Sequence, residues 1–502
     1  MTTSPTTTTT TTTTLIVGAG FGGLALGALL KRRGEDDFTI IERADEVGGT
    51  WRDNRYPGAA CDIPSHLYSF SFRPNPDWSH VFSPGPEILD YLKETAREEG
   101  LYEHVVFDAP MERAWWVPEE ARWHVATPAG EFVAQFLVTA TGHLSDPKLP
   151  DIPGLESFTG EVFHSARWDQ DADLSGKRVA VVGTGASAIQ IVPEIAKVAG
   201  SLTVFQRTPA WIGPRVEDSY SQQEKTLFRR DPATMKSLRD RLFWNNERTF
   251  AARRGIPEFL EEGRGQALDH LRRQVPDPEL REKLTPNYEL GCKRRLMSNT
   301  FYPALQQPNV ELEASALESV EGSTLKAASG ETYEADVIVF ATGFEITEPP
   351  YAALVENAAG ETLADQWSRR GMQAFHSTTV ANFPNLFSIN GPNTSLGHNS
   401  IVHIIESQAA FVLGALDHIR AQGAEVITTR EDAESAYVDE IDEHAMGTVW
   451  LEGNCDSWYV DPRSGKLTTI WPDFAYAFRD ENGEFDPEGY EFAPAPAASA
   501  AS

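Results

Sequence analysis

The most regular hydrophobic pattern in the chain is a short apolar strand that runs directly into a glycine-rich turn, and it occurs twice. The first copy joins a strand at 15–17 to the turn GAGFGG at 18–23, and a helix of small apolar residues follows. The second copy, KRVAVVGTGASA at 177–188, repeats the order of strand, turn and helix. Such a turn lets backbone N–H groups approach a pyrophosphate, and the helix N-terminus favours the anion. The pattern therefore predicts two nucleotide-binding units.

The residue that ends the following strand differs between the two units. In the first unit the strand at 38–42 ends in Glu42, which is placed to hydrogen-bond a ribose diol and suits FAD or NAD. In the second unit Arg207 and Thr208 stand at that place, and a cation there suits the 2′-phosphate of NADPH. The spacing from first glycine to this position is 24 residues in both units. We therefore predict an α/β fold with two Rossmann-like dinucleotide-binding domains, one for FAD and one for NADP.

The remaining patterns predict how the chain is divided between these domains. Residues 217–285 are densely charged, with apolar positions at helical spacing, which indicates a helical insertion. A long apolar helix at 402–422 indicates a return to the first domain. The predicted division is a disordered Thr-rich lead at 1–14, a FAD-binding domain at 15–145 and 350–490, an NADP-binding domain at 151–216 and 286–345, the helical insertion at 217–285, and a disordered tail at 491–502.

Charge and cysteine usage narrow the classes of function. The net charge of the 502 residues is −31, which argues against binding to nucleic acid. No stretch approaches the about 20 apolar residues of a membrane-spanning helix. The three cysteines show no CxxC spacing or close pair, and no residues have the spacing of metal ligands. We therefore expect a reduced, cytoplasmic protein without a metal site.

The stretch between the two units carries the pattern Phe158-x-Gly160-x-x-x-His164-x-x-x-Trp168-Asp169. It resembles the fingerprint of the type I Baeyer–Villiger monooxygenases, class B flavin-dependent enzymes that insert an oxygen atom beside a ketone carbonyl. The loop at 48–62 resembles the family's segment that lines the flavin ring, and 291–305 resembles its Lys-Arg segment. The likeness covers most of the chain, from about residue 14 to 480.

The resemblance implies a reaction in which NADPH reduces FAD, O₂ forms a C4a-peroxyflavin, and a ketone becomes an ester or lactone. It implies that Asp62 and Arg294 form the catalytic pair, and that Lys293 joins Arg207 and Thr208 at the 2′-phosphate. The fingerprint residues would couple domain movement to catalysis. The cofactor-binding residues expected in all are Gly18, Gly20, Phe21, Gly23, Glu42, Gly49, Trp51, Tyr56, Asp62, Gly183, Thr184, Gly185, Ala186, Ser187, Arg207, Thr208, Lys293 and Trp458.

Two segments, 391–400 and 459–472, depart from relatives that oxidise cyclic ketones, so no preference for cyclic ketones is implied. We expect a small ketone or sulfide and O₂ as substrates, and a monomer or homodimer. Three alternatives stay open. A flavin N- or S-monooxygenase would give N-oxide or sulfoxide without ester. The lack of a close cysteine pair disfavours an NADPH oxidase or reductase of the disulfide reductase type. Rapid NADPH turnover would exclude a non-catalytic FAD-binding protein.

Overall fold

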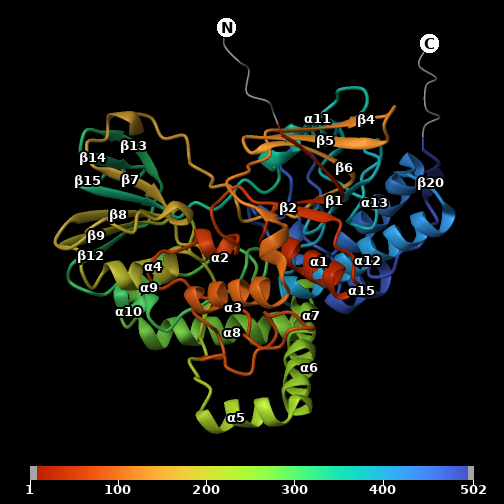
Figure 1. Ribbon diagram of the computed structural model, residues 1–502. Helices are drawn as coiled ribbons and strands as arrows, with labels where there is room; N and C mark the ends of the chain where they lie inside the picture. The colour runs from red at the N-terminus through yellow and green to blue at the C-terminus, as the bar shows by residue number, and fades with distance from the viewer. Residues whose placement is uncertain (1–7, 496–502) are drawn as a thin grey trace.

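The computed structural model describes residues 8–495, and its first domain is built on an eight-stranded sheet (Figure 1). The strand order is β17-β4-β5-β6-β1-β2-β3, and β18 also pairs with β6. The central strands are parallel, whereas β4, β5 and β6 form an antiparallel meander. The strands are β1 (Thr9–Val17), β2 (Phe38–Ile41), β3 (Val105–Val106), β4 (Arg113–Val117), β5 (Arg122–Thr127), β6 (Gly130–Thr139), β17 (Val355–Glu356) and β18 (Leu386–Ser388).

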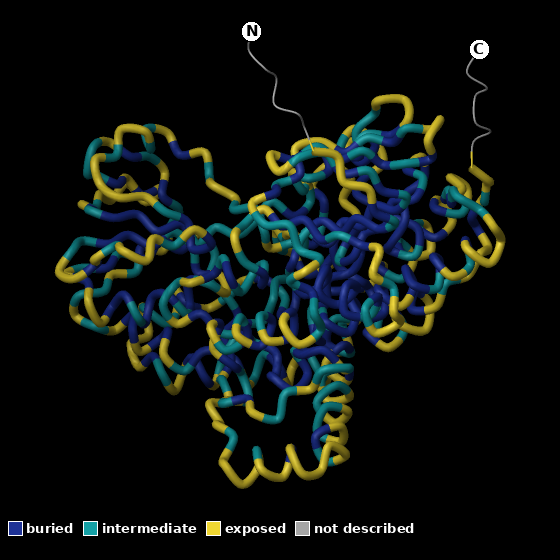
Figure 2. Tube along the Cα trace, viewed as in Figure 1, coloured by how far each residue is buried: buried dark blue, intermediate teal, exposed yellow. Residues whose placement is uncertain are grey.

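Helices α1 and α12 pack together beside this sheet, and α12 is buried along most of its length. Figure 2 shows that buried residues concentrate around them. A small antiparallel pair, β19 (Val426–Thr429) and β20 (Tyr490–Ala493), closes this end of the chain. The helices of the first domain are α1 (Phe21–Arg32), α2 (Thr50–Asp53), α3 (Gly85–Glu98), η1 (Leu101–His104), η4 (Pro350–Leu354), α11 (Leu363–Arg370), α12 (Ile401–Gln422), α13 (Glu431–Ala445), α14 (Val449–Glu452) and α15 (Ala475–Asn482).

The second domain contains a five-stranded parallel sheet in the order β12-β9-β8-β16-β7 and a three-stranded antiparallel sheet in the order β13-β14-β15. Its strands are β7 (Glu161–His164), β8 (Arg178–Val182), β9 (Ser201–Phe205), β12 (Val310–Glu313), β13 (Leu317–Glu321), β14 (Thr324–Ala327), β15 (Thr332–Glu334) and β16 (Val337–Phe340). Its helices are η2 (Leu155–Ser157), η3 (Ser165–Arg167), α4 (Ala188–Ile195) and α10 (Phe301–Ala304).

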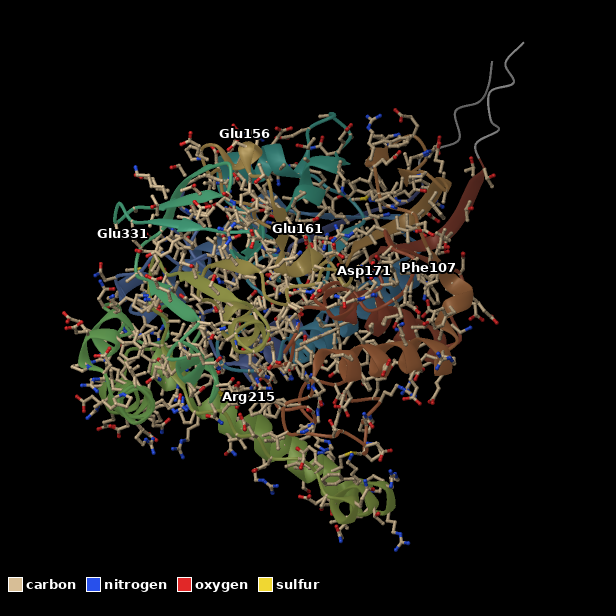
Figure 3. All side chains as sticks on the ribbon, turned by 90° about the vertical axis from the view of Figure 1, so that its left-hand side faces the viewer. Phe107, Glu156, Glu161, Asp171, Arg215 and Glu331 are labelled. Carbon is tan, nitrogen blue, oxygen red and sulfur yellow. A yellow bond between two sulfur atoms is a disulfide. The ribbon has the colours of Figure 1, made fainter. Side chains whose placement is uncertain are left out.

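The helical insertion follows β10 (Ile212–Gly213) and returns at β11 (Leu296–Met297), which pair in parallel. A capping box between Ser221 and Glu224 starts its first helix, and the Asp231 side chain caps the second. The first two helices form an arm that protrudes from the body of the molecule (Figure 3), and both contact the segment at 66–77 of the first domain. The helices of the insertion are α5 (Gln222–Arg230), α6 (Pro232–Arg248), α7 (Phe250–Arg253), α8 (Pro257–Gln274) and α9 (Pro278–Lys283).

Both chain ends are more ordered than expected. The lead at 1–14 is not disordered throughout, because Thr9 to Thr14 belong to β1 and pair with β6. Thr12 and Thr14 are buried, as alternate side chains of a strand against a core should be. The expected tail at 491–502 begins inside β20. The rest of both expectations, residues 1–7 and 496–502, lies outside the described residues.

The expectation that the cysteines are reduced is wrong for two of the three. Cys292 and Cys455 form a disulfide, although 163 residues separate them along the chain, and Cys61 is free and buried. Sequence spacing could not show this pair, because only the tertiary fold brings the two residues together. Within residues 8–495, no helix combines the length and apolar character that crossing a membrane requires.

Candidate active site

The two glycine turns have the same construction. Gly18 and Gly183 both have positive φ, +107° and +111°. A Cβ at Gly18 would lie 2.8 Å from the Ala140 carbonyl oxygen, and one at Gly183 would lie 2.6 Å from that of Ala341. Each turn thus lies against the residue that follows a neighbouring strand of its own sheet, β6 or β16. Its backbone angle is one that residues with a side chain rarely adopt. Only glycine fits at either position.

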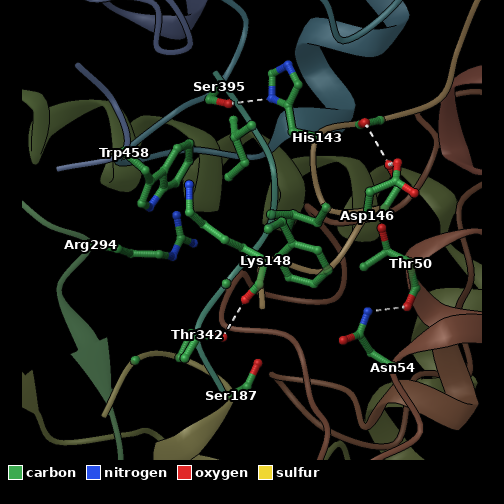
Figure 4. Close-up of a pocket in the computed structure, with 18 of the residues that line it drawn as sticks. Thr50, Asn54, His143, Asp146, Lys148, Ser187, Arg294, Thr342, Ser395 and Trp458 are labelled. Atoms are coloured by element: carbon green, nitrogen blue, oxygen red, sulfur yellow. Dashed lines mark hydrogen bonds between the residues drawn. The ribbon is translucent and has the colours of Figure 1, made fainter. Parts of the chain in front are cut away.

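One cavity of about 1500 Å³ lies between the domains and is lined by both turns. Figure 4 shows part of its wall. It exceeds the about 300–1,000 Å³ of an ordinary small-molecule pocket, so it has room for more than one ligand. Gly23 is the one predicted cofactor residue that does not line it; a Cβ there would lie 1.9 Å from the Gly18 carbonyl oxygen, so Gly23 serves helix packing. The predicted residues that line it are Gly18, Gly20, Phe21, Glu42, Gly49, Trp51, Tyr56, Asp62, Gly183, Thr184, Gly185, Ala186, Ser187, Arg207, Thr208, Lys293, Arg294 and Trp458.

The first turn suits a dinucleotide. Gly20 is the N-cap of α1, where no side chain caps the helix, and a Cβ at Gly20 would meet only Gly49, at 3.6 Å. Backbone N–H groups at this helix end are therefore open to a phosphate. Glu42 accepts a hydrogen bond from the Ala19 N–H at 2.8 Å and pairs with Arg52 at 2.9 Å. The sequence did not indicate the ion pair between Glu42 and Arg52, because only folding brings the two side chains together and buries them.

Asp62 and Arg294 form a bidentate ion pair on the wall of the cavity. The Arg294 Nε and Nη2 atoms donate to the two Asp62 carboxylate oxygens at 2.6 and 2.7 Å. Burial alone would raise the pKa of the Asp62 carboxyl, but the adjacent Arg294 charge holds the pKa below its usual range. The same carboxylate raises the pKa of Arg294 despite its burial. Both groups are therefore charged at neutral pH.

Two backbone contacts complete this pair. Arg294 Nη1 donates to the Leu396 carbonyl oxygen at 3.4 Å, and Arg215 Nη2 donates to the Cys61 carbonyl oxygen at 3.2 Å. The buried Tyr459 lies nearby, and burial raises the pKa of its hydroxyl group. The contact to Leu396 connects the pair to the segment that departs from the cyclic-ketone relatives.

Cations gather at the second turn. Burial lowers the pKa of the Lys293 ammonium group, and the positive charge of Arg207 lowers it further, which indicates that these two side chains share one region. Lys293 Nζ also lies 5.2 Å from the centre of the Tyr288 ring. The Thr184 hydroxyl donates to the Thr208 carbonyl oxygen at 3.2 Å and fixes the turn against the strand end. This arrangement suits an anion.

The chain matches the family described as flavin-binding monooxygenase-like over residues 12–253. A Baeyer–Villiger monooxygenase of Streptomyces coelicolor is 48% identical over 96% of this chain and 93% of its own. One from Pseudomonas aeruginosa is 40% identical over 99% of this chain and 95% of its own. The chain belongs to the Baeyer–Villiger monooxygenases. The solved structure of OTEMO in complex with FAD and NADP has a TM-score of 0.84 and 27% identity, covering 96% of this chain and 99% of that one.

These findings confirm the predicted family and the predicted fold of two Rossmann-like domains in this monooxygenase. The site residues assigned from the resemblance stay predictions. Among residues 8–495, no group of three or more His, Cys, Asp or Glu side chains is arranged to hold a metal ion.

The fingerprint of this Baeyer–Villiger monooxygenase lies outside the cavity wall. Glu161 to His164 form the edge strand β7, so part of this linker belongs to the second sheet. A Cβ at Gly160 would lie 2.1 Å from the Asp336 carbonyl oxygen, and the Trp168 ring packs edge-on against Phe163 at 4.8 Å. Phe158 packs against the core of the second domain, and Asp169 is exposed. Burial lowers the pKa of His164 to about 4.

Tyr56 links the two domains of the monooxygenase. Its hydroxyl donates to the Gln190 side chain at 3.0 Å, and Gln190 in turn donates to the Ala60 carbonyl oxygen at 3.0 Å. Trp51 donates from its ring nitrogen to the Tyr68 hydroxyl at 3.2 Å. Sequence reasoning missed Gln190 and Tyr68; Gln190 lies on α4 directly after the second turn, which was the available signal.

Trp458 is 41% exposed and lies against Tyr459, with 4.0 Å between ring centres. Figure 4 shows Trp458 and Arg294 on the same side of the cavity. Cys455, three residues earlier, also lines the cavity, and its disulfide to Cys292 joins this loop to the Lys-Arg segment. The cross-link therefore restricts how far the Trp458 loop can move from Arg294.

Proposed function

We propose that this Baeyer–Villiger monooxygenase uses NADPH and O₂ to insert an oxygen atom beside a ketone carbonyl, giving an ester or lactone. FAD bound at the first turn would supply the chemistry of hydride acceptance and oxygen activation. The observation that carries the proposal is the charged Asp62–Arg294 pair on the wall of a cavity shared by both dinucleotide turns.

Arg294 would stabilise the negative charge that develops on the ketone oxygen. Of its five N–H donors, two donate to Asp62 and one to Leu396, which leaves two unused by these bonds. A guanidinium that is already held in place stabilises such charge by about several kcal/mol, since no reorganisation is needed as the charge appears. Asp62 would keep the guanidinium plane in position through its two hydrogen bonds.

Arg207, Thr208 and Lys293 would select NADPH. Burial and then the charge of Arg207 lower the pKa of Lys293; a phosphate dianion bound between the two cations would offset their repulsion, so binding would gain from both charges. Trp458, on the cross-linked loop, would cover the nicotinamide side of the cavity.

The proposal extends to three finer points. Sulfides would be secondary substrates, because the same cavity can present an activated oxygen to a soft sulfur atom. The protein would act as a monomer or homodimer. It would work in the cytoplasm, where NADPH is regenerated.

Labelled dioxygen tests the proposed reaction. The purified yellow protein is supplied with NADPH, ¹⁸O₂ and separate linear and cyclic ketones, and the products are identified by mass spectrometry. We expect one ¹⁸O atom in each ester or lactone for each NADPH consumed. NADPH consumption that yields only hydrogen peroxide would refute the proposal. Sulfoxide or N-oxide without any ester would favour the alternative N- or S-monooxygenase.

A further inference from the structure

Residues 395–400, here called the pocket loop, form part of the cavity wall through Ser395, Leu396 and Asn399. From 396 to 400 the loop has no helix or strand, and its backbone is therefore not held by a ladder of hydrogen bonds. Leu396 nevertheless presents its carbonyl oxygen to Arg294. Something outside the loop must fix its conformation.

The helical insertion supplies those contacts. Arg253 of α7 donates to the Gly397 carbonyl oxygen at 2.7 Å. Glu247, in the last turn of α6, accepts from His398 Nε2 at 3.0 Å and from Asn399 Nδ2 at 2.6 Å. The insertion thus reaches across to the first domain, where α6 and α7 rise towards α15 (Figure 1).

Glu247 is the centre of this arrangement. Its carboxylate is 2% exposed and also accepts from the backbone N–H groups of Ala475 at 3.3 Å and Tyr476 at 3.2 Å, at the start of α15. Burial alone would raise the pKa of Glu247, but the hydrogen bond from His398 and the other donors hold it below its usual range. A fully satisfied negative charge at a helix N-terminus thus joins three segments that are distant in sequence.

The hydrogen bond between His398 and Glu247 has one possible direction. Because a carboxylate accepts, the His398 ring must donate through Nε2, and burial lowers the pKa of the ring so that it is neutral. Its Nδ1 atom is buried without a hydrogen-bond partner among the described residues. The bond from Nε2 to Glu247 is therefore the one hydrogen bond that orients the ring. Glu247 therefore fixes both side chains that follow Leu396 and Gly397 in the pocket loop.

We propose that Glu247 is a positioning residue for oxygen insertion: by holding His398 and Asn399, it keeps the Leu396 carbonyl against Arg294. Two bonds to Asp62 fix one edge of the guanidinium, and the bond to Leu396 fixes the other, so the unused N–H groups keep one direction. This inference rests on the proposed role of Arg294. A shift of about 1 Å in such a group can cost about 100-fold in rate.

Two variants of Glu247 test the inference, with a buried glutamate elsewhere as control. In Glu247→Gln one oxygen can still accept from His398 and Asn399, whereas Glu247→Ala removes every contact. Glu434→Gln also removes a buried carboxylate, which accepts from Ala381 and Gln373, and neither partner belongs to the cavity wall. We expect oxygen insertion to fall about 100-fold in the alanine variant, about 10-fold in the glutamine variant, and less than two-fold in the control.

Two further readouts separate positioning from general loss of structure. Flavin reduction by NADPH without oxygen should change less than two-fold in all three variants, since the role proposed for the pocket loop is confined to holding Arg294 for oxygen insertion. Hydrogen exchange of residues 395–400, measured on the purified protein without NADPH or substrate, should accelerate at least ten-fold in Glu247→Ala and remain unchanged in Glu434→Gln.

The outcomes are distinguishable. Unchanged loop exchange, or unchanged ester formation in Glu247→Ala, overturns the inference. If the alanine variant does not fold, the glutamine variant decides: ester formation equal to that of the control overturns the inference. Failure of the unmodified enzyme to form any ester would instead refute the proposed function, and the exchange measurement would still test the contact.

Discussion

Replacing Arg294 is the most direct test of the active site, because one side chain is assigned to one step. Arg294→Ala removes both bonds to Asp62 and the bond to Leu396. Loss of one fixed donor to a developing oxyanion typically lowers kcat by about 10²–10³, or about 3–4 kcal/mol. With both unused N–H groups and the charge removed, we expect at least the upper value for ester formation.

The change also affects stability by an amount that the structure limits. Breaking a fully buried ion pair by removing one partner costs about 3–5 kcal/mol. The side chains of Asp62 and Arg294 are 29% and 28% exposed, so water can solvate the remaining carboxylate and about 2 kcal/mol is expected. Arg294→Lys keeps a charge but loses the planar fork, so ester formation should lie between the alanine variant and the unmodified enzyme.

Two rates measured on each variant separate the steps. The bleaching of flavin absorbance by NADPH without oxygen should stay within about three-fold, while ester yield in air should collapse into uncoupled NADPH oxidation. Arg295→Ala is the matched control, because Arg295 follows in the same segment and does not line the cavity. A normal ester yield in Arg294→Ala would refute the assignment, and an equal loss in Arg295→Ala would attribute the effect to the segment rather than to the guanidinium.

Three further predictions concern the cofactor, the cross-link and pH. Arg207→Ala should raise the KM for NADPH at least ten-fold and leave the KM for NADH nearly unchanged; equal effects would remove its role at the 2′-phosphate. Changing both Cys292 and Cys455 to Ser should lower the free energy of unfolding, measured in urea, by about 3–5 kcal/mol. A thiol titration of the unfolded, unreduced parent that finds three free thiols would contradict the disulfide. Burial lowers the pKa of His66 and of His164 to about 4, whereas the pKa in the unfolded chain is about 6.5. Stability should therefore fall as pH drops from 6.5 towards 4, by about 1.4 kcal/mol per pH unit for each ring, and His66→Phe should flatten the urea-midpoint profile between pH 7 and 5.

The glycine turns could be predicted from the sequence because each imposes a local constraint on the backbone. Gly18 and Gly183 have positive φ and lie close to a carbonyl oxygen. Because only glycine tolerates both conditions, each turn is marked by a glycine in the sequence. Glu42 and Arg207 both stand 24 residues after the first glycine of their turn, just after the strand that follows the helix, although α1 and α4 differ in length. The Thr-rich start was misread for the opposite reason: threonine suits both a strand and a polar lead, and only pairing with β6 places Thr9 to Thr14 in the sheet.

Two nucleotide-binding units and the family could be identified from the sequence alone. Which distant residues meet depends on the tertiary fold: Asp62 and Arg294 are 232 positions apart, Glu247 and His398 are 151 apart, and Cys292 and Cys455 are 163 apart. The physical reason is that a turn restricts backbone angles over a few residues and thereby marks the local sequence. A charge pair or a disulfide depends on where whole domains bring two side chains, and either residue alone carries no mark of its partner.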